Sequence, residues 1–281
     1  MLKWHLLTML EQRSLLLTAS GANFISGVLA ARQLQSFTLP STSNLSLGDA
    51  IFVAYAGPAL GAIDVTLVAI WLLNLILFLF LVSPLIGKQS NTNNDLILLR
   101  IASRKQWLAG ILSSVFIAGL FYVSLIMMCA LLGISLVQGW RIQPTSLFQE
   151  LGVWMTVSDL SFVQIWGMVW ILLLSSYIAH GFLLIFLALR LGNIIWALLF
   201  IVVFTLLTWQ VGAGDNVYTW QVWLPAAQSI VSRHFPFEER LPAFTITFSL
   251  TYNVVASLCC ILAAVITVQS LDFTRGYHDR E

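Results

Sequence analysis

The hydrophobic positions of this sequence fall into six long runs separated by polar segments. Five runs are almost purely apolar, and one near the start is diluted by Ser, Thr, Gly and Asn. A helix needs about 20 mostly apolar residues to cross a membrane. We therefore predict six spanning helices, with five as the alternative count. The predicted spans cover residues 14–31, 65–86, 108–137, 162–189, 194–211 and 244–268.

The most informative polar interruption lies between the second and third spans, over residues 87–108. Asn and Asp side chains at 93–95 are good helix caps, so the pattern predicts a short helix over 94–108. Its Arg100, Arg104 and Trp107 follow i, i+4, i+7 spacing and share one side. Periodicity alone leaves three roles open: a surface that docks a protein, a solvated loop, or a surface that attracts anionic lipid.

Composition places the chain in a membrane. Apolar residues make up 59% of the sequence and charged residues 9%, far below the roughly one quarter that soluble domains carry. The net charge of +1 gives no reason to expect nucleic acid as a partner. The three cysteines lie in apolar runs without metal-ligand spacing, so we expect them to pack as small hydrophobic side chains and to form no metal site. These features predict an all-α integral membrane protein with one transmembrane domain, 1–281.

The basic residues predict which ends of the spans face the cytoplasm. With both termini inside, nine of the thirteen Lys and Arg residues lie on the cytoplasmic side and four on the outer side. Cytoplasmic loops of membrane proteins carry the excess of Lys and Arg. We therefore expect both termini inside. Arg32 is the exception, because it follows the first span directly and would face outward.

The stretch LLRIASRKQWLAG, which leads directly into the third span, carries a family resemblance through Arg100, Ser103, Arg104 and Trp107. With the six-span layout, it resembles the permease subunit of ATP-binding-cassette transporters of the type-2, exporter-like superfamily. The chain lacks the Glu-Arg pair and the Gly-Thr that family members often carry before this helix. The resemblance implies an amphipathic elbow helix at 1–13, an ATPase-docking coupling helix at 94–108, and an outer re-entrant segment at 212–242 that is broken near Pro225.

The same resemblance implies a function. The sequence has no G-x-x-x-x-G-K-[ST] phosphate loop, so the chain is not expected to be an enzyme by itself, and a separate ATPase subunit would bind ATP and Mg²⁺. A second permease copy or a homologous permease would complete the path. We expect an exporter of amphiphilic or hydrophobic cargo, such as a peptide, lipid or drug. We expect it in the cell membrane, the bacterial cytoplasmic membrane in particular.

Three polar residues within or beside the spans are further candidates: Asp64, Asn74 and His180. Ionisable groups inside a membrane are costly and often functional. Ser176 lies four residues before His180 and is expected on the same helix face. A proton relay would need these groups to meet across helices. The simpler interpretation is a boundary Asp in water and a histidine hydrogen-bonded between helices.

Other classes of function stay open at this stage. A proton- or ion-coupled secondary transporter predicts inverted repeats and helices broken near the membrane centre. A membrane-embedded lipid-processing enzyme or protease needs clustered catalytic groups, and Asp64 with His180 alone does not make such a set. A binding-only immunity or scaffold protein is a further alternative.

Overall fold

The computed structural model describes residues 11–36, 46–57, 65–87, 104–140, 142, 161–212, 219–235, 237–238 and 240–270. These residues form seven α-helices and three 3₁₀ turns, with no strand among them. Six of the helices are long and apolar enough to cross a membrane. The predicted all-α fold and the count of six spans are thus confirmed over the described part of the chain. The spanning helices are α2 (Arg13–Ser36), α4 (Val65–Gly87), α6 (Arg104–Gln138), α8 (Phe162–Leu191), α9 (Ile194–Gly212) and α10 (Ile246–Ser270).

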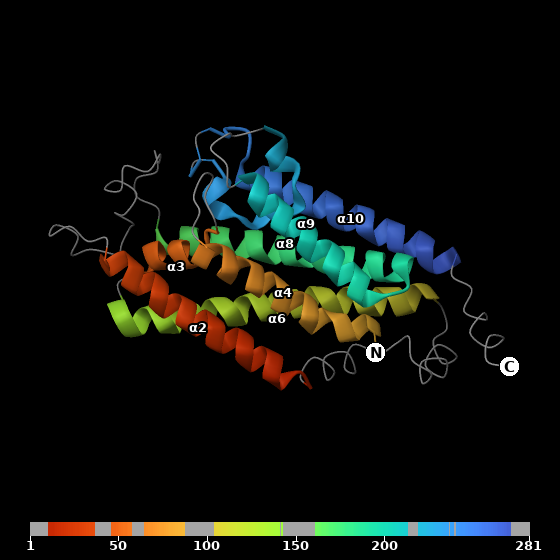
Figure 1. Ribbon diagram of the computed structural model, residues 1–281, viewed down its shortest axis with the longest axis horizontal. Helices are drawn as coiled ribbons and strands as arrows, with labels where there is room; N and C mark the ends of the chain where they lie inside the picture. Colours follow the sequence, from red (N-terminus) through yellow and green to blue (C-terminus); the bar gives the residue numbers. More distant parts are fainter. Residues whose placement is uncertain are drawn as a thin grey trace.

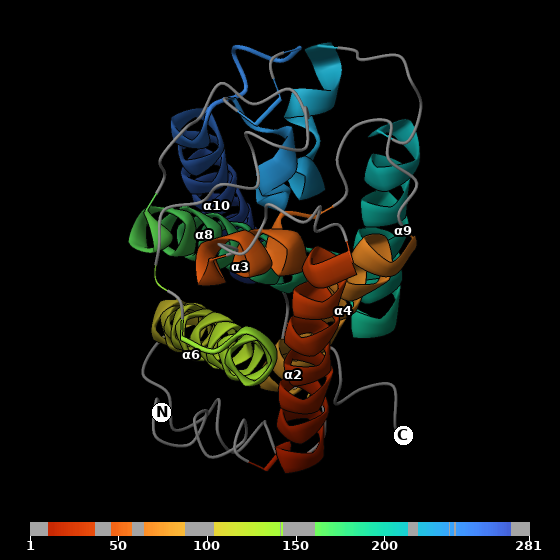
Figure 2. The ribbon, with the colours of Figure 1, turned by 90° about the vertical axis from the view of Figure 1, so that its left-hand side faces the viewer.

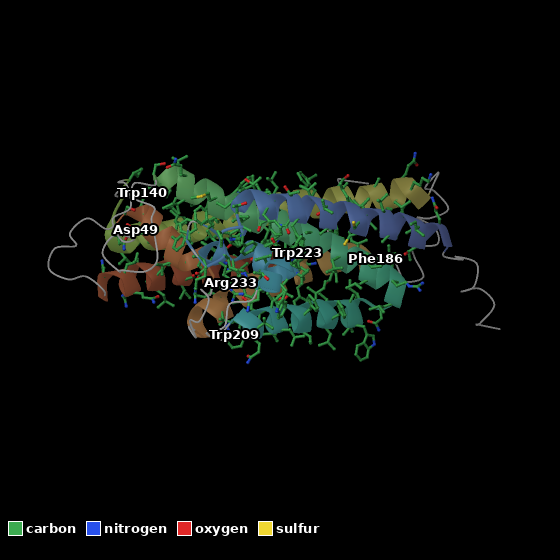
Figure 3. The ribbon with its side chains drawn as sticks, turned by 90° about the horizontal axis from the view of Figure 1, so that it is seen from above. Asp49, Trp140, Phe186, Trp209, Trp223 and Arg233 are labelled. Carbon is green, nitrogen blue, oxygen red and sulfur yellow. The ribbon has the colours of Figure 1, made fainter. Side chains whose placement is uncertain are left out.

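Consecutive spans run in opposite directions along the long axis of the bundle (Figure 1). Trp140, just beyond the end of α6, and Phe186, near the end of α8, accordingly lie toward opposite ends of the molecule (Figure 3). The starts of α2, α6 and α9 therefore share one end with the last residues of α4, α8 and α10. We call this the basic end, because Arg13, Arg104, Lys105 and Arg190 belong to it.

Helix α8 is the centre of the bundle. It lies between α6 and α10 (Figure 2) and also contacts α4, α9 and the short helix α3 (Leu47–Tyr55). It is the most buried of the six spans, whereas α9 and α10 are the least covered by the rest of the chain. A helix that is apolar on all sides suits such a central position.

Local signals explain where α8 ends and α9 begins. Ser161 and Gln164 form a capping box at the start of α8. Gly192 ends the helix in the left-handed conformation, φ 63°, which glycine adopts without steric cost. The Asn193 side chain then accepts a hydrogen bond from the backbone N–H of Ile195 at 2.8 Å. This stop and cap make the tight turn between the two spans.

Helices α2 and α6 pack closely because glycine replaces larger side chains at their crossing. A Cβ added at Gly27 would lie 2.2 Å from the carbonyl oxygen of Ala130, and one at Gly133 would lie 2.2 Å from that of Phe24. Small residues at helix contacts let backbones approach in membranes, where apolar surface alone gives no preference for protein over lipid. The polar dilution of this first run thus matches a helix packed against protein.

Two short segments fill one side of the bundle. Helix α3 is buried along nearly its whole length, with Ser46 and Asp49 forming a capping box at its start. The turns η1 (Thr219–Trp223), η2 (Pro225–Ser229) and η3 (Val231–Arg233) connect α9 to α10. Of these, η2 contacts α8, α9 and α10. Neither segment is long enough to cross the membrane. The surrounding helices cover both of them, as backbone at membrane depth requires.

Candidate functional site

The predicted docking segment lies only partly in the described residues. Arg100 and Ser103 fall outside them, as does most of the predicted helix 94–108 and nearly all of the elbow 1–13. Arg104 is the first residue of α6, so residues 104–108 are the first turns of the third span, which begins four residues before its predicted start. Lys105 and Gln106 are exposed there. The basic residues at this end therefore continue without interruption into a spanning helix.

Trp107 has a different environment from the one its spacing predicts. Its side chain is only 6% exposed and belongs to the main hydrophobic core. The tryptophan therefore contributes to the packing of this chain, and the exposed neighbours Lys105 and Gln106 are the side chains presented outward at that turn.

Asn74 belongs to a buried polar cluster that joins four helices. Its side-chain amide exchanges hydrogen bonds with that of Asn23, at 2.7 and 3.1 Å. The Tyr55 hydroxyl of α3 lies 2.7 Å from Oδ1 of Asn23 and 2.8 Å from the carbonyl oxygen of Ile126, so its one proton faces two acceptors. Tyr122 of α6 donates to the backbone oxygen of Asn74 at 3.0 Å. The cluster thus specifies how α2, α3, α4 and α6 fit together.

His180 lies in α8 and is almost fully buried. Its Nδ1 donates to the carbonyl oxygen of Ser176 at 2.8 Å, and the Ser176 hydroxyl lies 3.4 Å from the same nitrogen. The predicted sharing of a face with Ser176 is confirmed. Among the described residues no hydrogen bond joins His180 to another helix, and its partner is one turn back on α8. Asp64 lies outside the described residues, so its relation to His180 stays a prediction.

The two short segments contact each other within the bundle. The backbone N–H of Ser232 donates to the carbonyl oxygen of Ala56 at 3.0 Å, and its hydroxyl donates to that of Gly57 at 3.2 Å. Gly57 has φ 75° and its Cα faces Ile230, so a side chain there would be strained. Trp71 of α4 donates from its indole to the Ser229 hydroxyl at 2.9 Å. Residues far apart in sequence are tied here into one assembly.

A second polar network holds the segment before α10. Nδ1 of His234 bonds to the carbonyl oxygen of Ile230 at 2.9 Å, which makes Nε2 an acceptor in the neutral ring. The Ser249 hydroxyl lies 2.6 Å from this Nε2 and 2.7 Å from Oε1 of Gln228. One hydroxyl proton therefore faces two acceptors. His234 and Ser249 are both fully buried, so the pair serves as an internal link in this conformation.

Charged groups cluster beside this network. Burial lowers the pKa of Arg233 to about 10, and the carboxylate of Glu238 partly opposes that shift. Glu238 itself forms a bidentate ion pair with Arg240, whose Nε and Nη2 donate to the two carboxylate oxygens at 2.6 and 2.7 Å. Burial also lowers the pKa of His234 to about 4, against the smaller raising effect of its backbone hydrogen bonds. The imidazole is therefore neutral near pH 7.

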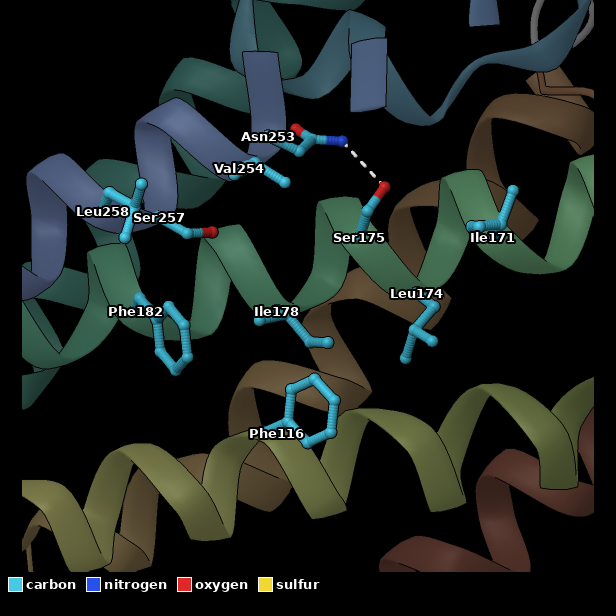
Figure 4. A pocket seen from close by; sticks show the side chains of 10 residues that line it. All are labelled: Phe116, Ile171, Leu174, Ser175, Ile178, Phe182, Asn253, Val254, Ser257 and Leu258. Carbon is cyan, nitrogen blue, oxygen red and sulfur yellow. Dashed lines mark hydrogen bonds between the residues drawn. The ribbon is translucent and has the colours of Figure 1, made fainter. Parts of the chain in front are cut away.

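Three cavities lie along α10. The first, about 310 Å³, opens between α6, α8 and α10 (Figure 4). The second, about 120 Å³, has His180, Pro225 and Tyr252 in its wall. The third, about 380 Å³, lies on the Trp223 and Phe248 side. Asn253 lines the first two cavities, and Tyr252 and Ala256 line the last two. The cavities therefore follow one another around a single helix.

Several of these residues were not found from the sequence. A capping box at Ser46 and Asp49 is visible as Ser-x-x-Asp and could have marked the start of α3. His234 and Ser249 stand fifteen residues apart without a motif, so only the fold brings them together. Within the described ranges, no group of three or more His, Cys, Asp or Glu side chains could hold a metal ion.

No family model, curated protein or solved structure matches the chain.

Proposed function

We propose that this chain is the membrane-spanning permease subunit of an ATP-driven transporter, powered by a separate ATPase subunit. It works as a pair of permeases and exports an amphiphilic or hydrophobic substrate. The observation that carries the proposal is helix α6, because it starts at the basic segment that the sequence predicts to dock an ATPase and continues through the whole bundle.

Helix α6 is long enough to transmit movement from a docked ATPase to the other spans. Its 35 residues extend about 52 Å at about 1.5 Å per residue, against about 30 Å of hydrocarbon core. It contacts α2, α3, α4, α8 and α10. A rigid helix that projects from the membrane and contacts most of the bundle can convert movement of a docked ATPase into movement of the other spans.

The distribution of charge supports the orientation of the proposal. Arg13, Arg104, Lys105 and Arg190 share the basic end of the bundle, whereas Arg32, Arg233 and Arg240 lie outside it. The positive-inside tendency assigns the basic end to the cytoplasm. The docking segment, the start of α6 and the ATPase are then on the same side of the membrane, as the proposed mechanism requires.

The exposed surface of the bundle leaves room for a second permease. Helices α9 and α10 are covered least by the rest of the chain. Large apolar side chains such as Ile195, Trp196 and Phe200 are exposed along α9. In a bilayer this surface contacts lipid or a second copy. The pairing predicts a stable dimer in mild detergent.

Co-purification from native membranes tests the proposal. An ATPase subunit is expected to co-purify with the tagged chain, and the double substitution Arg100→Glu and Arg104→Glu should release it. Arg32→Glu is the control, since it reverses one arginine charge at an exposed position of α2 away from the basic end. Failure to recover any ATPase, together with full transport in the double variant, would contradict the proposal.

One observation favours an ion-coupled carrier as the second candidate. Helix α3 ends at Tyr55, whose hydroxyl reaches Asn23 and Ile126 inside the bundle, and helices broken within the membrane are common in such carriers. Transport by a carrier should continue in vesicles depleted of ATP when an ion gradient is imposed. Transport by the proposed permease should stop.

A further inference from the structure

Helix α4 is attached unevenly to the rest of the bundle. In its first half, the Trp71 indole donates to the hydroxyl of Ser229, and the Asn74 amide exchanges hydrogen bonds with that of Asn23. In its second half, 75–87, no residue hydrogen-bonds to another element within the described part of the chain. Polar bonds therefore hold the first half in place, and apolar packing alone holds the second.

Apolar packing restrains a helix less in a membrane than in water. A leucine that leaves a protein contact in a bilayer meets lipid, which is as apolar as the contact it left. Leu81, Val82 and Leu85 are fully buried in this conformation. Moving them outward costs the packing that they lose, without the further cost of exposing them to water. The second half of α4 is thus the half that is free to shift.

Pro84 interrupts the backbone hydrogen bonds of α4 three residues before the helix ends at Gly87. Proline has no N–H, so the carbonyl oxygen of Phe80, four residues earlier, lacks its usual helical donor. The Ser83 hydroxyl donates to this oxygen at 3.0 Å. One side-chain hydrogen bond thus takes the place of the missing backbone bond.

Two other serines show what is particular about Ser83. Ser135 of α6 and Ser175 of α8 also donate to the carbonyl oxygen three residues back, at 2.9 and 3.2 Å. No proline follows either serine, so the next backbone N–H is available to the same oxygen. Their hydroxyls add a second bond to that oxygen, whereas the hydroxyl of Ser83 supplies the bond that the backbone cannot make.

Helix α6, on the other side of the predicted docking segment, has the opposite character. Its 35 residues include no proline. It is also bonded to other helices at separate points, since Tyr122 donates to the backbone of Asn74 and Gln138 donates to that of Ala31. The end of α4 and the start of α6 lie at the same end of the bundle (Figure 1). Residues 88–103 therefore join a helix with a proline near its end to one without.

From these observations we infer that Ser83 and Pro84 form a hinge in α4. The last turn of α4 pivots there. Its Phe80 carbonyl is bonded to Ser83 in the conformation described and is released when the turn swings outward, while the first half of the helix stays in place. The hinge does not depend on the proposed function. The statement that it lets a docked ATPase move α6 without disrupting α4 rests on that function.

Distance measurement by double electron–electron resonance tests the hinge. The sample is the purified full-length chain in phosphatidylcholine nanodiscs, diluted with unlabelled chain so that only distances within one chain are recorded. Spin labels are attached at Lys88→Cys, the first position after α4, and at Ile195→Cys, an exposed position at the same end of α9. The three native cysteines are replaced by serine: Cys129, Cys259 and Cys260. Two distances are expected, one for each position of the last turn.

Two variants identify the cause of the second distance. Pro84→Ala restores the backbone donor to Phe80 and should leave one distance. Ser83→Ala removes the substitute bond and should shift the ratio of the two populations about tenfold toward the outward position, the effect of one lost hydrogen bond of about 1.4 kcal/mol. Ser135→Ala removes a serine bond of the same kind from α6 and should leave the ratio unchanged.

A second pair of labels is the control for the labelled helices themselves. Leu73→Cys and Val203→Cys are exposed positions on the first half of α4 and on α9, and they should give one distance with proline or alanine at position 84. A single distance for the first pair in the chain that keeps Pro84, or two distances that persist in Pro84→Ala, would overturn the inference.

The outcome also separates the hinge from the proposed function. Two distances in a chain that recruits no ATPase would keep the hinge and reject the transporter. A chain that recruits an ATPase but gives one distance would keep the transporter and reject the hinge. Where both hold, Pro84→Ala should retain the ATPase and lose transport, and full transport in this variant would overturn the role of the hinge in coupling.

Discussion

Asn23 and Asn74 exchange hydrogen bonds between α2 and α4 through their side-chain amides. Nδ2 of Asn23 donates to Oδ1 of Asn74 at 2.7 Å, and Nδ2 of Asn74 donates back to Oδ1 of Asn23 at 3.1 Å. Both residues are 2% exposed or less. A reciprocal pair of this kind satisfies two buried amides at once, and each then depends on the other.

Asn74→Leu should therefore destabilise the protein by about 1–2 kcal/mol, because the Asn23 amide loses both of its bonds to residue 74 and keeps only those to Tyr55 and to the carbonyl oxygen of Ala19. The bond from Tyr122 to the backbone of residue 74 does not need the side chain and should persist. Unfolding in detergent, followed by circular dichroism, measures the loss. The double variant Asn23→Leu and Asn74→Leu should lose less free energy of unfolding than the two single variants lose together. Simple additivity would show that the pair is not coupled.

Gly27→Ala should separate α2 from α6. The new methyl group would meet the carbonyl oxygen of Ala130, and backbone atoms on both helices prevent a local adjustment. We expect a loss of about 1–3 kcal/mol, the range for overpacked sites. Gly21→Ala, on the same helix but with nothing within 4 Å, is the matched control and should be neutral or slightly stabilising. Equal thermal midpoints for the two variants would contradict the close approach.

Trp107→Ala should act mainly on stability. A buried tryptophan cut to alanine costs roughly 3–5 kcal/mol, and Trp107 lies in the main core. Lys105→Ala, at an exposed position two residues earlier, should change the free energy of unfolding by less than about 0.5 kcal/mol. Thermal unfolding of both variants in detergent makes the comparison. A native midpoint for Trp107→Ala would mean that this side chain is available to a partner.

Stability should fall on acidification because of His234. Burial lowers its pKa to about 4, below its ordinary value of about 6.5. Between these values the unfolded chain binds more protons at this residue than the folded one, so the free energy of unfolding decreases as pH falls. Above about pH 6.5 this contribution of His234 to the free energy of unfolding is complete, and it is lost by about pH 4, with a total on the order of a few kcal/mol.

His234→Asn removes the titration while keeping a side-chain donor toward Ile230. Its thermal midpoint at about pH 7 should be lower than that of the wild type, and its further decrease down to about pH 4 should be smaller. Parallel pH profiles for the two proteins would assign the acid sensitivity to other groups.

The spans could be predicted because each is a long apolar run, and the six helices begin within four residues of the predicted starts. The start of α6 was misplaced since Arg104 to Gln106 are polar, although they continue the same helix. Helix α3 could not be recognised by hydropathy, because its nine residues are too few for a span. Its burial depends on contacts with α2, α6 and α8, which are distant in sequence.

The candidate site residues could also be predicted from the sequence only in part. Asn74 and His180 stood out as polar residues in apolar runs, and both are buried. Their partners differ in how far they could be inferred. Ser176 is one helical turn from His180 and was predicted, whereas Asn23 belongs to another helix and was not. Spacing along one helix is readable from a sequence, but the contact of two helices depends on packing.

The short length of α3 has a consequence for how the protein is made. Its nine residues extend about 14 Å, about half of the hydrocarbon core, and its first turn carries the buried Asp49. Such a segment cannot be stably inserted alone, because its free backbone groups and its carboxylate would face lipid. α3 is therefore stable in the bilayer only with α2, α4, α6 and α8 around it. The Tyr55 hydroxyl, which lies 2.8 Å from the carbonyl oxygen of Ile126, completes its contacts only once α6 is in place.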